Sequence, residues 1–320
     1  MKTIIKITAT AVLIILFAFT TANNQNKHKT EDLVLKTETG DIFGQLVYPE
    51  ENNQVPLVII IAGSGSTDMD CNTPMFKTNS YKYLAEELAN NNIASLRFDK
   101  RGIAKSKDAM NSEPELRFGN YVDDVVGWIK WLKNERDFSK LFIAGHSEGS
   151  LIGMLAAQKT DISGYISISG VGKPASEIIK EQLKSQPPMV QQDSAPIIES
   201  LLAGNTVPDV KPYLMSLFRP SVQSYLISWF KYDPRLEIEK LKVPVLIIQG
   251  TTDIQVPVEN AELLHQAAKQ SELRIIEGMN HILKDAPVDR QQNMASYGQT
   301  ELPVNVEITT VIEDFIKKNN

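Results

Sequence analysis

The sequence is poor in the residues that build disulfide frameworks and metal centres. It contains one cysteine, Cys71, and four histidines among 320 residues. A single cysteine excludes an intramolecular disulfide, and the spacing of cysteine and histidine matches no metal-binding motif. A lone cysteine is more often a small packed residue than a nucleophile. We therefore expect no metal site and no catalytic role for Cys71.

Basic clusters are also missing. The chain has 33 Lys and Arg against 39 Asp and Glu, a net charge of -6 and a pI near 5.4, with no basic run. That balance argues against nucleic acid as a partner. The remaining composition, 42% hydrophobic and 22% charged, is typical of a globular protein. A chain of this length can form a single large α/β domain with an insertion.

Long apolar runs are limited to the N-terminus. Lys2 and Lys6 precede an apolar run over residues 7–19, and small residues follow it. This pattern predicts a cleaved signal peptide over residues 1–22 and an extracytoplasmic protein, periplasmic or secreted. The run is short for a membrane span, and an N-terminal membrane anchor is the alternative. Polar residues 23–30 predict a disordered linker, and we expect no integral membrane domain in the mature chain.

From residue 31 onward, strand patterns alternate with helix patterns. Residues 32–37 and 41–48 alternate apolar and polar positions about a turn, as an antiparallel hairpin does. Continuous apolar runs predict buried strands at 57–62 and 141–144, and strand patterns predict further strands at 94–98, 164–169, 243–248 and 273–276. Helical patterns occur at 81–89, 121–132, 151–157, 258–268 and 306–317. The alternation predicts an α/β fold whose mainly parallel sheet is covered by helices on both faces.

The alternation stops over residues 173–240, a segment that we call the insertion. It is rich in proline, methionine and aromatic residues and predicts several short helices. The α/β core is then expected over residues 31–172 and 241–320. The apolar side chains of the insertion predict its own small core, a lid whose inner face lines an acyl or alcohol pocket, or both.

A G-x-S-x-G motif lies between the strand at 141–144 and the helix at 151–157. Its residues are Gly145-His146-Ser147-Glu148-Gly149, in the strand–turn–helix context that this motif requires. So sharp a reversal leaves no room for a Cβ two residues before or after the nucleophile. Ser147 is therefore the predicted nucleophile. The following helix aims free N–H groups and its positive dipole end at the same point.

A serine nucleophile needs a general base, and His281 is the best candidate. It lies in a loop directly after the strand at 273–276, where parallel sheets place their sites. His28 lies in the polar start, and His265 sits inside an amphipathic helix. His146 is adjacent to the nucleophile, where a side chain usually points away from it.

The base in turn needs an orienting acid. Asp253 lies in a loop after the strand at 243–248, and Asp285, close to His281, is a weaker alternative. The chain order Ser147, Asp253, His281 is the order found in α/β-hydrolases and differs from the trypsin-like and subtilisin-like orders. We therefore predict these three residues as a catalytic triad.

An oxyanion hole needs two N–H donors aimed at one point. The backbone N–H of Glu148, directly after the nucleophile, is one predicted donor. The other is the N–H of Ser64 in Gly63-Ser64-Gly65, the loop after the strand at 57–62. The glycines allow the backbone to approach a substrate closely.

These segments resemble the α/β-hydrolase superfamily, and within it the serine esterases and the lysophospholipase or serine-aminopeptidase-like group. The resemblance covers nearly all of the mature chain and rests on residues 62–68, 98–102, 145–149, 250–253 and 278–281. It implies an eight-stranded, mostly parallel sheet, a Ser–Asp–His triad and no cofactor. It also implies that Asp99 and Arg101 tie loops together near the site. The chain departs from the commoner His-Gly oxyanion pattern, because Ala62 precedes Gly63.

The predicted activity is acyl transfer to water through a covalent acyl-enzyme. A small-molecule carboxylic ester of modest size is the expected substrate. The alternative is an aminopeptidase or amidase, which would need an acidic pocket for the substrate's ammonium group. Candidates for that pocket are Glu177, Glu181, Asp193 and Glu199. A third hypothesis is a non-catalytic binding protein, in which one or more residues of the triad would be expected to be replaced. The sequence leaves the oligomeric state open.

Overall fold

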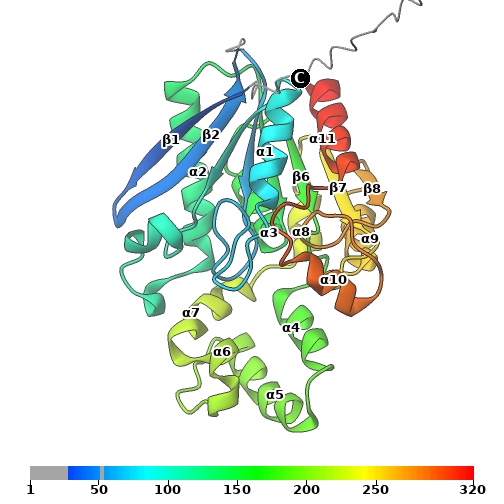
Figure 1. Cartoon of the computed structure of the whole chain (residues 1–320). Coiled ribbons are helices and arrows are strands. Elements are labelled where there is room, and N and C mark those ends of the chain that lie inside the picture. Colours follow the sequence, from blue (N-terminus) through cyan, green and yellow to red (C-terminus); the bar gives the residue numbers. More distant parts are fainter. Residues whose placement is uncertain (1–27, 51–53) are drawn as a thin grey trace, which may run out of the picture.

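Eight strands form one sheet in the order β1-β2-β4-β3-β5-β6-β7-β8 (Figure 1). The computed structural model describes residues 28–50 and 54–320. The strands are β1 (His28–Thr37), β2 (Gly40–Pro49), β3 (Leu57–Ile61), β4 (Ala94–Phe98), β5 (Leu141–His146), β6 (Gly164–Ile168), β7 (Val245–Gly250) and β8 (Glu272–Ile276).

The first two strands are antiparallel and the rest run parallel. β1 pairs antiparallel with β2, and β2 pairs antiparallel with β4. Every later pair, from β4·β3 to β7·β8, is parallel. Strands β3 to β7 are buried along their whole length, as strands of a sheet covered on both faces must be. The prediction of an eight-stranded, mostly parallel sheet is confirmed.

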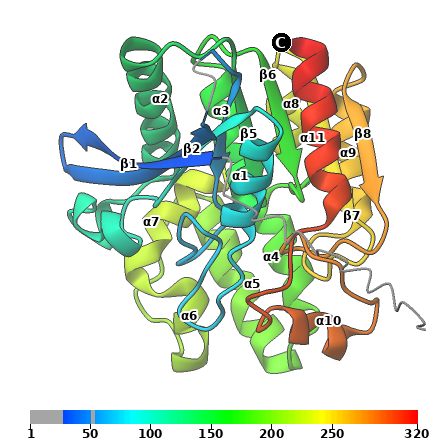
Figure 2. The ribbon, with the colours of Figure 1, turned by 45° about the horizontal axis from the view of Figure 1, so that its top comes forward.

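Helices cover both faces of this sheet. α1 and α11 lie on one face, and α2, α3, α8 and α9 lie on the other (Figure 2). Two apolar clusters result, with Phe315 buried in one and Trp128 in the other. The bounds are α1 (Ser80–Asn90), α2 (Phe118–Glu135), α3 (Glu148–Ala157), α8 (Pro234–Glu239), α9 (Val258–Ala267) and α11 (Val306–Asn319).

Between β6 and β7 the chain forms short helices at the end of the molecule away from the C-terminus (Figure 1). They are α4 (Ala175–Leu183), α5 (Pro188–Leu202), η3 (Pro212–Leu214), α6 (Met215–Phe218) and α7 (Pro220–Trp229), followed by α8. Pro188, Pro220 and Pro234 begin α5, α7 and α8, because a helix's first N–H needs no partner. That this insertion acts as a lid stays a prediction.

Three shorter elements complete the chain and lie in its connections. They are the 3₁₀ helices η1 (Ala104–Ala109) and η2 (Glu113–Glu115) after β4, and α10 (Arg290–Ser296) before α11. Within residues 28–50 and 54–320, no helix has the length and apolar character needed to cross a membrane.

The start of the chain differs from the sequence prediction. Residues 28–30 were expected in a disordered linker, but they form the start of β1, where Lys29 pairs with Tyr48. Because β2 extends to Pro49, it offers backbone partners to residues 28–30 of β1. The polar side chains of β1 remain accessible, since β1 is the edge strand of the sheet. The predicted signal peptide, residues 1–22, and residues 23–27 lie outside the described residues.

Candidate active site

Ser147 occupies a strained turn between β5 and α3. Its backbone has φ 54° and ψ -120°, which is uncommon for a residue other than glycine. A Cβ on Gly145 would lie 2.2 Å from the Gly149 carbonyl oxygen, and one on Gly149 would lie 2.4 Å from the Ile61 oxygen. Both positions therefore require glycine, as the motif predicts.

His281 and Asp253 meet in the loops after β8 and β7. Nδ1 of His281 lies 2.8 Å from Oδ2 of Asp253, and both side chains are buried. The other carboxylate oxygen accepts the N–H groups of Gln255 and Val256, at 2.8 and 2.9 Å. Asp285 instead accepts a bond from Asn305 at 2.6 Å. The structure therefore pairs His281 with Asp253 rather than with Asp285.

The environment of Asp253 keeps its carboxylate charged. Burial by itself favours the neutral acid. The interaction with His281 and the N–H groups of Val256 and Gln255 outweigh burial, and they hold the pKa of Asp253 below its ordinary value. A charged Asp253 accepts a hydrogen bond from the Nδ1–H of His281, and this leaves Nε2 free to accept a proton from a nucleophile.

The loops of Ser147 and His281 lie side by side, although their side chains are not bonded. In the part of the chain that the structure describes, no hydrogen bond joins Ser147 to His281. The ring of His146 packs 4.6 Å from the ring of His281, measured between centroids. Such catalytic bonds often form only when substrate is bound.

His146 holds the His281 loop against the nucleophile strand. Nε2 of His146 lies 2.8 Å from the His281 carbonyl oxygen, and Nδ1 lies 2.7 Å from the Tyr81 hydroxyl. A carbonyl oxygen only accepts, so Nε2 carries the proton and Nδ1 accepts from Tyr81. Burial, with the nearby His281, lowers the pKa of His146 to about 3. His146 is therefore neutral and fully occupied. Nothing in the sequence signalled the part played by Tyr81.

The two predicted oxyanion donors flank Ser147. A Cβ on Gly63 would lie 3.2 Å from the Ser147 Cβ, so the Gly63–Ser64 loop passes directly beside the nucleophile. Among the described residues, neither the Ser64 N–H nor the Glu148 N–H has a hydrogen-bond partner. Both groups are therefore available to a ligand. That they form an oxyanion hole stays a prediction.

Asp99 and Arg101 do tie loops together beside this site. The Asp99 carboxylate accepts the N–H groups of Met69 and Lys105, at 2.8 and 3.1 Å. Arg101 pairs with Asp124 on α2, with Nε 2.8 Å from Oδ2. These contacts fix the segment after β4 against the loop of Met69 and against α2.

A cavity of about 560 Å³ opens between the nucleophile and the insertion. Ser64, Ser147 and Glu148 line it on the core side, and α4 and α7 line it on the other. The apolar part of its wall is mainly aliphatic, with Ile103, Met110, Leu116, Val171, Ile178, Ile179, Leu217, Val222, Leu226 and Val256, plus Trp229. Glu177, Glu181, Asp193 and Glu199, the acidic residues proposed for an ammonium pocket, do not line it.

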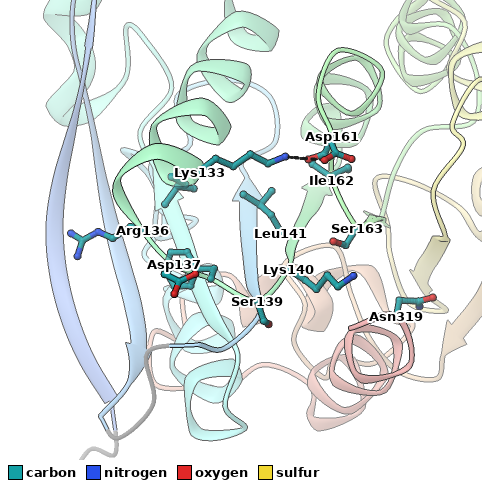
Figure 3. Close-up of a pocket in the computed structure, with 12 residues that line it drawn as sticks. Lys133, Arg136, Asp137, Ser139, Lys140, Leu141, Asp161, Ile162, Ser163 and Asn319 are labelled. Atoms are coloured by element: carbon teal, nitrogen blue, oxygen red, sulfur yellow. Dashed lines mark hydrogen bonds and ion pairs between the residues drawn. The ribbon is translucent and has the colours of Figure 1, made fainter.

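A second hollow lies at the opposite ends of β5 and β6 (Figure 3). Figure 3 shows Lys133 reaching Asp161, to whose backbone and side chain it is bonded. Arg136 pairs with Glu31. Parallel sheets carry their sites at the carboxyl ends of the strands. This hollow borders the amino ends and does not contain the predicted site residues. Within the described residues, no group of three or more His, Cys, Asp or Glu is placed to hold a metal ion.

Comparison with known proteins gives matches among hydrolases. A hydrolase family described as serine aminopeptidase matches residues 77–225, a stretch with Ser147 but without Asp253 or His281. Esterase EstD of Thermotoga maritima is 24% identical over 254 residues, covering 77% of this chain and 60% of that protein. A probable aminopeptidase, YbaC of Bacillus subtilis, is 23% identical over 223 residues, covering 55% and 70%.

Solved structures match the fold across most of the chain. Est1E of Butyrivibrio proteoclasticus, solved with ferulic acid bound, has a TM-score of 0.60 at 18% identity and covers 90% of this chain and 98% of that one. Esterase Pf2001 of Pyrococcus furiosus has a TM-score of 0.56 at 16% identity, covering 91% and 92%. At such identities the likeness concerns the fold alone.

Proposed function

We propose that this chain, which belongs to the α/β-hydrolase superfamily, hydrolyses carboxylic esters of modest size through an acyl-enzyme. One observation carries the proposal. Nδ1 of His281 and Oδ2 of Asp253, from the loops after β8 and β7, lie 2.8 Å apart, and the ring of His281 packs against His146, the residue before the strained turn of Ser147. A serine, a histidine and an acid in this arrangement are the parts that acyl transfer requires.

The proposed reaction has two steps. Ser147 Oγ attacks the ester carbonyl carbon while His281 Nε2 takes its proton, and the Ser64 and Glu148 N–H groups bind the oxyanion. The intermediate then collapses as His281 gives the proton to the leaving alcohol, which leaves the acyl group on Ser147. Water then attacks the acyl-enzyme as His281 takes its proton, and His281 returns that proton to Ser147 Oγ as the bond to the acyl group breaks and the acid leaves. Asp253 stabilises the imidazolium in both steps.

The charges in the cavity favour an ester over an N-terminal peptide bond. Among the described residues, two carboxylates line the cavity, Glu113 and Glu148. Glu113 is bonded to Arg219, whose guanidinium holds the pKa of Glu113 below its ordinary value. Glu148 is bonded to Lys100. A substrate ammonium group would be bound best by a carboxylate that has no other cationic partner. The carboxylates of Glu113 and Glu148 are each already paired with a cation. The match to the serine aminopeptidase family keeps aminoacyl amides as the second candidate.

The test is labelling with a fluorophosphonate, followed by digestion and mass mapping. We expect label on Ser147, and none on the Ser147→Ala variant, which should also lose ester turnover by about 10⁴-fold or more. Ser185→Ala, an exposed serine of the insertion, is the matched control and should keep both. Ester turnover by a folded Ser147→Ala protein would overturn the proposal. Faster cleavage of aminoacyl anilides than of acyl esters would favour the second candidate.

We also propose an extracytoplasmic location, which rests on the apolar run and small residues of segment 1–22. N-terminal sequencing of the protein recovered from a periplasmic or secreted fraction should find a chain that begins near residue 23. An intact N-terminus in the membrane fraction would favour the anchor.

A further inference from the structure

The side chains of Lys100 and Glu148 form a buried ion pair beside the nucleophile. The reaction proposed above uses the backbone N–H of Glu148 but neither of these two side chains. Lys100, just after β4, places Nζ 3.0 Å from Oε2 of Glu148, and the side chains are 2% and 3% exposed. Two charges removed from water are expensive to bury, and an apolar pair of similar volume is often at least as stable. Stability by itself is therefore a weak reason for this pair.

Lys100 also holds the loop that carries Ser64. Its Nζ donates to the Gly63 carbonyl oxygen at 2.5 Å. That oxygen and the Ser64 N–H belong to one planar trans peptide, in which the C=O and N–H point in opposite directions. The bond from Lys100 to the oxygen thus fixes the direction of the Ser64 N–H. The remaining side of the ammonium faces the Tyr121 ring, 4.8 Å from its centroid.

Glu148 connects the same cation to the second predicted donor. Its backbone N–H is the other predicted oxyanion donor, and its carboxylate accepts from Lys100. One ammonium group therefore ties together the two residues whose N–H groups must converge on the oxyanion. Preorganised donors are the largest electrostatic contribution to acyl transfer.

The same carboxylate is bonded to the insertion. The Tyr225 hydroxyl, on α7, donates to Oε1 of Glu148. Tyr225 is buried and packs edge-on against Tyr121, with ring centroids 5.8 Å apart. A chain of hydrogen bonds therefore connects α7, through the Glu148 carboxylate and Lys100, to the loop that carries Ser64.

We propose that Lys100 is a positioning residue of the oxyanion hole, and that Tyr225 couples the hole to the insertion through Glu148. This inference rests on the proposed ester hydrolysis. It assigns Lys100 no contact with the reacting atoms, since two of its three N–H donors are occupied by Gly63 and Glu148 and the ammonium also lies against the Tyr121 ring. Loss of the network should therefore lower kcat and leave KM largely unchanged.

The main test is the double variant K100M/E148Q. Lys100→Met by itself leaves Glu148 charged and unpaired, and this variant is expected to fold poorly. The double variant has no unpaired charge and keeps the Glu148 N–H. We expect kcat for a p-nitrophenyl ester to fall about 100-fold, as when one oxyanion donor is lost, with KM within about twofold. Affinity for a trifluoromethyl ketone, whose adduct on serine carries an oxyanion, should fall by a similar factor.

Tyr225→Phe tests the coupling to the insertion. It removes one hydrogen bond to a charged group and keeps the ring, so kcat should fall about tenfold. Tyr213→Phe is the matched control, since it also removes a hydroxyl–carboxylate bond, to Asp193, on the exposed side of the insertion. Tyr213→Phe should leave kcat unchanged.

The outcomes separate this inference from the function on which it rests. If the wild-type protein hydrolyses no ester and Ser147 takes no label, the proposed function fails and the inference falls with it. If the wild type is active and folded K100M/E148Q keeps kcat within twofold, or raises only KM, the positioning role is overturned and the function stands. Equal effects of Tyr225→Phe and Tyr213→Phe would overturn the coupling alone.

Discussion

The nucleophile turn and the insertion are built under opposite constraints. Of residues 141–157, which form β5, the turn and α3, only Ser147 is not buried. Of the fifteen residues of α5 in the insertion, four are buried, namely Ser194, Ile197, Ile198 and Leu201. At Gly145 and Gly149 the first region is packed backbone against backbone, whereas only one face of α5 is buried. The active-site turn should therefore tolerate almost no change, and the insertion should tolerate many.

The largest expected contrast is in catalysis. Asp253→Asn keeps the shape of the side chain but removes the charge that orients His281, and kcat should fall about 10⁴-fold. Asp193→Asn, in the insertion, should change kcat by less than about twofold, since Asp193 is partnered by Lys211 outside the cavity. Steady-state kinetics on a p-nitrophenyl ester would measure both. Asp285→Asn as the more damaging change would make Asp285 the acid.

A second contrast concerns the free energy of unfolding. Gly149→Ala would place a Cβ 2.4 Å from the Ile61 oxygen, and the resulting backbone shift should destabilise the fold by about 3 kcal/mol or more. Gly204→Ala, just after α5, meets open space but keeps φ at +82°, so it should lose only about 1 kcal/mol. Urea titrations monitored by circular dichroism would measure the free energy of unfolding of both variants. Equal losses would contradict the proposed difference between the two regions.

The third prediction concerns acid. Burial lowers the pKa of His146 from 6.5 to about 3, so the unfolded chain binds this proton more readily. The stability conferred by neutral His146 is complete above pH 6.5 and falls by about 1.4 kcal/mol per unit as the pH drops toward 3. His146→Gln removes this titration and keeps a donor for the His281 carbonyl.

The corresponding measurement is the free energy of unfolding at several pH values between 7 and 4. The difference between wild type and His146→Gln should shrink as the pH falls. The insertion contains no histidine. It therefore adds no histidine titration to the change in stability between pH 7 and 6. A difference that stays constant with pH would show that His146 is not held neutral.

The smallest effect is expected where the insertion meets the core. Arg219 on the insertion pairs with Glu113 in η2, and the two side chains are 38% and 31% exposed. Arg219→Gln should lower the free energy of unfolding by less than about 1 kcal/mol, because water screens such pairs. The loss should shrink further in high salt. A loss above 2 kcal/mol would mean that the insertion is held more rigidly than its exposure suggests.

Much of the core was predictable because short-range patterns control it. Continuous apolar runs marked the buried strands β3 and β5, and Gly145 and Gly149 marked the turn at Ser147. The chain order of Ser147, Asp253 and His281 was readable because the loops after parallel strands meet at one edge of the sheet. Residues 28–30 were misjudged as disordered, because an edge strand paired on one side need not look apolar.

The long-range polar network was not predictable. Tyr81 and His146 are 65 positions apart, and the bond between them, with that from His146 to the His281 carbonyl, depends on how α1, β5 and the loop after β8 pack together. The same holds for Lys100, Glu148 and Tyr225, which come from three separate segments. A lysine, a glutamate and a tyrosine have no periodicity that marks them as partners.

The sequence by itself therefore determined the α/β fold, the strained serine turn and the order of its candidate partners. These depend on local sterics and on the apolar period, both of which are written residue by residue. Only the tertiary structure decided which acid pairs with His281, which carboxylates face the cavity and which cation holds the Ser64 loop. These pairings depend on contacts between residues that are far apart in the chain, and such contacts form only when the chain packs into its tertiary structure.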